Sequence, residues 1–201
     1  MRMREIFVYA VDVSLLDADD ARWLRAVSDA RARHIREYRR ASDRRRSLGA
    51  ELALDAALKA LVPDYAPPPK YRYLKNGKPE LLSGAPRISL AHAGDFAICA
   101  ISDLPVGVDI EEKDRRSPMP VREWVGIESY LKLTGEGLSG SFRTLCAGED
   151  EIYLLGRHAA YLARAELGNC LICAASDEPA HLTVVEAHPE EPPRAFSEKF
   201  S

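Results

Sequence analysis

The apolar and polar positions of the chain change period several times, and each change indicates a new element. Alternation with period two indicates a strand, and apolar residues spaced three and four apart indicate a helix. Clusters of Gly, Pro, Asn and Asp separate these segments. The predicted helices are 17–30, 32–38, 43–61 (with Asp43 as its N-cap) and 124–134, and the predicted strands are 5–13, 71–74, 87–91, 96–102, 106–111, 159–166, 170–175 and 182–186.

The order of these elements divides the chain near Asp103. A strand, helical sequence and a closing pair of strands occur on each side of this position, although no sequence repeat is visible. The tail is charged and contains several Pro, which is typical of disorder. We therefore expect an N-terminal half over 1–102, a C-terminal half over 103–187 and a disordered tail over 188–201.

Length and charge narrow the function classes. The chain has 201 residues, of which 46% are apolar and 29% charged, as in an ordinary globular protein with a substantial core. No apolar stretch approaches the roughly 20 residues that span a bilayer, and the N-terminus has no signal-peptide pattern. We therefore expect a cytoplasmic protein with no membrane partner.

A local excess of positive charge stands out against the net charge of -3. Residues 31–46 contain eight Arg against only Glu37 and Asp43. A basic patch in a mildly acidic chain favours a small anionic ligand over nucleic acid, and Tyr38 is the one aromatic residue in the segment. The alternative is that these arginines coat the exposed face of an amphipathic helix pair.

The segment Val106-Gly107-Val108-Asp109-Ile110-Glu111 alternates along a predicted strand. Asp109 and Glu111 therefore point to one face, about 7 Å apart, where two carboxylates could share a hard cation. A solvated strand face that ends in acidic residues explains the same pattern.

The predicted helix 124–134 and two short segments carry further candidates. Trp124, Glu128 and Lys132 stack at i, i+4 and i+8, which places Glu128 and Lys132 together or forms a surface ion pair. Lys78 lies between Gly and Pro, so its backbone is held and its side chain is expected to be free. His92 ends a strand, where a lone His is more often structural.

The order of these segments resembles the surfactin-synthetase type of 4′-phosphopantetheinyl transferase over roughly residues 4–187. The strongest likenesses are the Gly-Val-Asp-Ile-Glu strand and the Trp-x3-Glu-Ser-x2-Lys-x2-Gly-x-Gly-Leu helix. The matching landmarks, in chain order, are Arg45-x3-Gly49, Gly77-Lys78-Pro79, the strand end 88–93 with His92, 106–111 and 124–138.

The resemblance implies an α+β fold of two pseudo-symmetric halves, each a small sheet packed with helices, with coenzyme A in the cleft between them. A serine of an acyl or peptidyl carrier protein would attack the β-phosphate, and a monomer would hold a complete site. The implied residues are Asp109, Glu111 and Glu128 for Mg²⁺, Glu128 and Lys132 for catalysis, and Arg45, Lys78, Pro79, His92, Lys132 and Arg31 for coenzyme A.

Three features differ from the usual family sequence. Ile127 stands where the family has Lys before the helix Glu, and Ala91 and Ala93 flank His92 where the family has serines. The segment 112–123 is shorter than the family's insertion, which helps to shape the carrier-protein surface. We therefore predict weaker coenzyme A binding than is typical of the family, and the sequence does not define the carrier protein.

Two other functions could use the same residues. A coenzyme A or nucleotide sensor would bind coenzyme A and modify no carrier protein. A Mg²⁺-dependent phosphohydrolase would use the three carboxylates to release phosphopantetheine or phosphate without an acceptor. The retained metal and phosphate positions favour an active transferase.

Overall fold

The computed structural model describes residues 4–116, 119–137 and 140–189 of the chain. Within these residues, helices occur together with two larger sheets and one two-stranded ribbon, which confirms the predicted α+β class. The helices are α1 (Ala21–Leu24), α2 (Asp29–Glu37), α3 (Ala41–Leu61), α4 (Val121–Thr134) and the 3-10 helix η1 (Gly140–Thr144). The strands are β1 (Arg4–Asp12), β2 (Tyr71–Tyr73), β3 (Pro79–Leu81), β4 (Arg87–Ala93), β5 (Phe96–Ser102), β6 (Val106–Glu112), β7 (Leu145–Ala147), β8 (Glu151–Leu154), β9 (Arg157–Leu167), β10 (Cys170–Ser176) and β11 (Ala180–Glu186).

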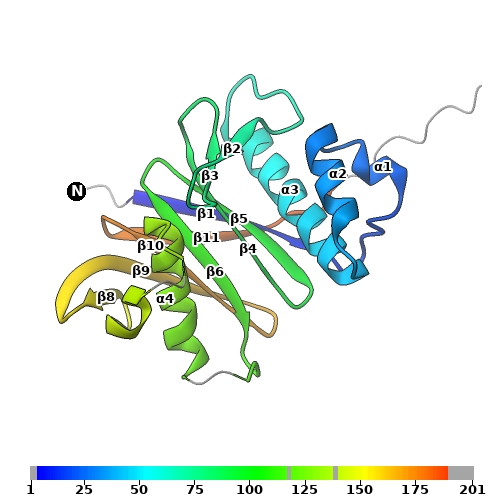
Figure 1. Ribbon diagram of the computed structural model, residues 1–201. Helices are drawn as coiled ribbons and strands as arrows, with labels where there is room; N and C mark the ends of the chain where they lie inside the picture. Colours follow the sequence, from blue (N-terminus) through cyan, green and yellow to red (C-terminus); the bar gives the residue numbers. More distant parts are fainter. Residues whose placement is uncertain (1–3, 117–118, 138–139, 190–201) are drawn as a thin grey trace, which may run out of the picture.

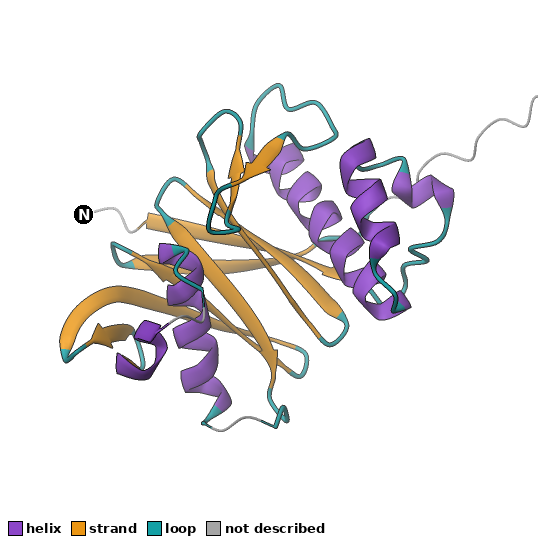
Figure 2. Ribbon diagram, in the orientation of Figure 1, coloured by secondary structure: helices purple, strands orange, loops and turns teal. Residues whose placement is uncertain are grey.

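The two larger sheets pack together and carry helices on their other faces. The first sheet has the strand order β11-β1-β5-β4, and the second has β6-β10-β9-β8-β7. Val8, Ile98, Val108 and Ile172 belong to one core that both sheets share. Helices α1 to α3 pack on the first sheet and α4 packs on the second, so helices lie outside the paired sheets (Figures 1 and 2).

The last strand departs from the expected division of the chain. The boundary near Asp103 does fall between β5 and β6, which lie in different sheets. However, β11 was expected within the C-terminal half, and it instead pairs in parallel with β1 of the first sheet. The end of the chain therefore closes the N-terminal sheet, because β11 covers an edge of β1 that would otherwise be unpaired.

Local hydrogen bonds change the predicted helices near the N-terminus. The predicted helix 17–30 is shortened to α1, and the predicted helix 32–38 begins earlier, at Asp29, because Asp20 caps α1 and the side chain of Ser28 caps α2. Asp43 is not an N-cap, since α3 already begins at Ala41. The short strands β3, β7 and β8 were not predicted, and three or four residues are too few to show a period.

Gly107 sets the position of α4 on the second sheet. A Cβ atom at this residue would overlap the backbone of Ser129 and Leu133, so only glycine lets the helix approach β6 so closely. Asp109 and Glu111 follow Gly107 on the same strand, and they share its face because side chains alternate. The contact therefore brings both carboxylates beside α4.

Two expectations concern the ends of the chain and the membrane. No helix in residues 4–116, 119–137 and 140–189 is long and apolar enough to cross a bilayer. Most of the tail that was expected to be disordered, residues 190–201, lies outside the described residues, as does Leu138 of the helix motif.

Candidate active site

A cavity of about 450 Å³ lies between elements of the two sheets. It is lined by residues of α2, α3 and β4 on one side and of β6 and α4 on the other. An adjoining pocket of about 250 Å³ shares Leu90, Glu128 and Lys132 with it. Cavities of roughly 300–1,000 Å³ typically bind small molecules, so a ligand of extended shape could occupy both.

Asp109 is the buried carboxylate of this cavity, with 5% of the residue exposed. Lys132 Nζ donates to its Oδ1 atom at 2.8 Å, whereas its Oδ2 atom is buried without a hydrogen-bond partner among the described residues. An unpaired buried carboxylate oxygen is costly, by about 1–3 kcal/mol. The structure therefore leaves one strong acceptor of Asp109 unused.

Glu111 lies on the same face of β6, and two side chains hold its carboxylate. The indole Nε1 of Trp124 donates to Glu111 Oε1 at 3.1 Å, and Arg115 forms an ion pair with the same oxygen. The guanidinium of Arg115 lies 5.1 Å from the centre of the Trp124 ring, as in a cation–π contact. Trp124 thus orients the carboxylate.

Glu128 faces the same cavity from α4 and is half-buried. Burial raises the pKa of its carboxyl, and the negative charge of Asp109 raises it further. Its ionised form is therefore the costly form in the folded protein, and a nearby cation would favour it.

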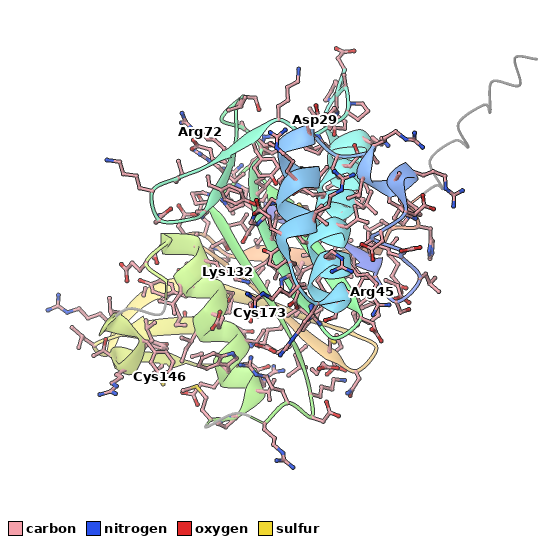
Figure 3. The ribbon with its side chains drawn as sticks, turned by 45° about the vertical axis from the view of Figure 1, so that its right-hand side comes forward. Asp29, Arg45, Arg72, Lys132, Cys146 and Cys173 are labelled. Carbon is pink, nitrogen blue, oxygen red and sulfur yellow. The ribbon has the colours of Figure 1, made fainter. Side chains whose placement is uncertain are left out.

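Lys132 does not form the intrahelical pair that its spacing from Glu128 suggested. Its ammonium group instead crosses to Asp109 of β6, and Figure 3 shows Lys132 on α4 at the side facing the N-terminal helices. The close packing of α4 on Gly107 explains this ion pair, because it brings Asp109 within reach of Lys132.

The three carboxylates offer the oxygen ligands that Mg²⁺ prefers, but their side chains are not grouped around one position. Oxygen ligands suit this ion, and the unused Oδ2 of Asp109 is a free acceptor. Within the described part of the chain, however, no three His, Cys, Asp or Glu side chains are grouped to hold a metal. Instead of a metal ion, Lys132 neutralises Asp109 and Arg115 neutralises Glu111.

The side of the cavity formed by the N-terminal elements carries basic and aromatic side chains, and it is called here the basic end. It is lined by Arg31 and His34 of α2, Tyr38 directly after α2, Tyr73 of β2 and His92 of β4. Burial lowers the pKa of His92, and the positive charges of Arg46 and Lys132 lower it further. The ring still contacts solvent because the cavity is open, and at neutral pH it is available as a neutral donor and acceptor.

The side chain of Lys78 is not free, contrary to expectation. Its ammonium group donates to the carbonyl oxygens of Val106 at 3.1 Å and of Leu133 at 2.8 Å. Burial lowers the pKa of Lys78, and Arg87 adds to this effect. Lys78 therefore ties the β2–β3 turn to β6 and α4, while it and Pro79 still line the adjoining pocket.

Arg45 lines neither the cavity nor the adjoining pocket. It lies on the first turns of α3, labelled in Figure 3, and the neighbouring Arg46 is the arginine whose charge acts on His92. Sequence reasoning also missed Ser47, His34 and Tyr73 as lining residues. His34 carried a signal, because it follows Arg31 by one helical turn.

Comparisons with known proteins do not identify a family for this chain. No protein-family model matches the chain, and no curated protein is significantly similar to it. The chemistry of the cavity therefore carries the functional conclusion.

Proposed function

We propose that this chain transfers the 4′-phosphopantetheine group of coenzyme A to a serine of an acyl or peptidyl carrier protein, as the family that it resembles does. The observation that carries the proposal is the unpaired Oδ2 atom of Asp109, buried in a cavity that also holds Glu128 and Lys132. The two sheets, each with its helices, would be pseudo-symmetric halves, and a cytoplasmic monomer would contain the whole site.

The two ends of the cavity suit the two phosphate groups of coenzyme A. The pyrophosphate fits the end with Asp109, Glu128 and Lys132, where a metal and a lysine can neutralise it. The 3′-phosphate fits the end with Arg31 and His92, whose N–H groups can donate to its oxygens. Pro79 and the aliphatic part of Lys78 would line the continuation of the ligand into the adjoining pocket.

The carboxylates would hold Mg²⁺ through Asp109, Glu111 and Glu128. When bound, Mg²⁺ neutralises the pyrophosphate oxygens and so stabilises the charge that develops on the leaving group. Asp109 would offer the oxygen that has no partner among the described residues, and Glu111 would share its carboxylate between Mg²⁺ and Arg115 or release Arg115.

The reaction would be an in-line transfer without a covalent enzyme intermediate. The serine Oγ forms a bond to the β-phosphorus, the bond from this phosphorus to the bridging oxygen breaks, and 3′,5′-ADP leaves with the electron pair. The serine proton passes to the carboxylate of Glu128, directly or through water. Lys132 donates to the oxygens of the leaving group.

Two observations favour a coenzyme A sensor as the second candidate. Both Asp109 and Glu111 are already paired with cations of the protein, so the fold closes without a metal. Ile127 is also buried in the core beneath α4, where it offers no charge to a ligand. A sensor would keep the ligand cavity and lack the transfer step.

The release of 3′,5′-ADP from coenzyme A distinguishes the candidates. We expect release that requires both Mg²⁺ and an apo carrier protein, with one equivalent of holo carrier for each 3′,5′-ADP. A hydrolase would release product without a carrier, and a sensor would bind coenzyme A and release nothing. Either of the last two results would contradict the proposed transferase.

A further inference from the structure

Glu51 is a carboxylate buried outside the cavity, in the middle of α3. Only 1% of the residue is exposed, and its neighbours along the helix, Ala50 and Leu52, are also buried. A buried carboxylate is costly unless it is paired and hydrogen-bonded, and an apolar residue would fill the same position at lower cost. We therefore expect Glu51 to interact with a partner side chain in the core.

Two side chains from other elements meet Glu51 in the core. Arg31 of α2 places its Nε atom 2.8 Å from Glu51 Oε1, and the phenol of Tyr71 of β2 donates to the same oxygen. The Nε–H bond of Arg31 is not aligned with that oxygen, so the contact is an ion pair rather than a hydrogen bond. Burial raises the pKa of Glu51, while Arg31 and Tyr71 both favour its ionised form.

Arg31 connects this buried group to the cavity. Its Nη2 atom donates to Ser47 Oγ at 3.0 Å, and both residues line the cavity, whereas Glu51 does not. The guanidinium also lies 6.0 Å from the centre of the Tyr73 ring. Since a guanidinium has five N–H donors, these contacts fix its plane and leave donors for an anion in the cavity.

We propose that Glu51 is a positioning residue that holds the Arg31 fork toward the basic end of the cavity, so that the site selects nucleotides with a 3′-phosphate. The proposal rests on the proposed function, because it takes coenzyme A as the ligand. An unrestrained Arg side chain loses rotamer freedom when it binds an anion, and this loss weakens binding. A fork that Glu51 and Ser47 already fix has lost most of this freedom before the ligand arrives.

Binding of coenzyme A and of dephospho-coenzyme A tests this role, because the two ligands differ only in the 3′-phosphate. Calorimetry on the wild type and on Glu51→Gln requires no carrier protein and no transfer. We expect the wild-type preference for coenzyme A to fall about tenfold in Glu51→Gln, as one charge-assisted contact would lose its geometry. Arg31→Ala should reduce the preference at least as much, leaving only the part that His92 supplies, and the double variant should resemble Arg31→Ala.

Tyr71→Phe is the matched control, since it removes the other partner of Glu51 and leaves the pair with Arg31 intact. We expect it to lower the melting temperature and to keep the preference for coenzyme A. A preference that is unchanged in Glu51→Gln would overturn the positioning role and leave the proposed function standing. Tighter binding of both ligands would also overturn it, because that result shows only the loss of a negative charge. A wild type that binds neither ligand would contradict the proposed function itself.

Discussion

The carboxylate of Glu51 on α3 and those of Asp109 on β6 and Glu128 on α4 differ in how far the protein itself pairs them. Glu51 is almost fully buried, yet Arg31 and Tyr71 both contact it. Asp109 is buried to a similar degree, but one of its oxygens has no partner in the described part of the chain. Glu128 beside it has a raised pKa because of burial and of Asp109.

This difference separates a structural carboxylate from one that is kept for a ligand. Folding tolerates a buried charge when the protein itself supplies the partners, as around Glu51. Where an acceptor stays unpaired and two carboxylates repel each other, the folded protein is destabilised, and a bound group from outside the chain can offset this destabilisation. A cation and a pyrophosphate are the groups that suit the end of the cavity with Asp109 and Glu128.

The largest expected effect is on the transfer rate and comes from Asp109, whose carboxylate has one unpaired oxygen among the described residues. Asp109→Asn keeps the shape of the side chain and removes its charge, so we expect the transfer rate to fall on the order of 10³-fold. Glu123→Gln, on the same helix as Glu128 but outside the cavity lining, should leave the rate unchanged. Equal rates for Asp109→Asn and the wild type would remove Asp109 from the chemistry.

The next largest effect is on stability and comes from Glu51, whose carboxylate is paired with Arg31 and Tyr71. Glu51→Gln should lower the free energy of unfolding by about 2 kcal/mol, because Arg31 loses its counter-charge in a buried setting. Urea denaturation followed by circular dichroism measures this change. A variant as stable as the wild type would show that the Glu51 cluster is no better satisfied than the carboxylates around Asp109.

A smaller effect of opposite sign is expected at Glu128. Glu128→Gln should raise the free energy of unfolding by about 0.5 kcal/mol at pH 7, since it removes the desolvation of a charge and its repulsion by Asp109. The same denaturation experiment applies. A loss of stability would mean that Glu128 is satisfied in the folded protein and that the contrast with Glu51 is false.

The pH dependence of that gain follows from the raised pKa. The folded protein binds the Glu128 proton more tightly than the unfolded chain, so the carboxyl stabilises most below its ordinary pKa of 4.5. This contribution is lost as the pH rises through the raised pKa of the folded state. Glu128→Gln and the wild type should therefore melt alike near pH 4 and diverge toward pH 7, and a gap that shrinks with rising pH would contradict the shift.

Apolar patterns made the central strands and α4 predictable from the sequence. The apolar residues of β4 and β6 alternate, β5 is a continuous apolar run, and Gly135 ends α4 in the left-handed conformation as expected. The break between α1 and α2 was predicted at the wrong position, because it depends on the caps at Asp20 and Ser28. Pairing of β11 with β1 is a long-range choice that no local pattern encodes.

The composition of the site was easier to predict than its contacts. Asp109, Glu111, Glu128, Lys132, His92 and Arg31 all line one cavity. The partners of Lys132 and Lys78 depend on how closely α4 approaches β6, which spacing along the chain does not show. Glu51 did carry a signal, since it stands within an apolar helical segment, but Arg31 and Tyr71 are distant in sequence.

The most direct test of the account is the intact mass of an apo carrier protein after incubation with this protein, coenzyme A and Mg²⁺. We predict that the wild type adds one phosphopantetheine group and that Glu128→Gln, although folded and no less stable, adds none. Equal modification by Glu128→Gln would contradict the assignment of the unsatisfied carboxylates to catalysis. No modification by the wild type on acyl or peptidyl carriers would contradict the transferase itself.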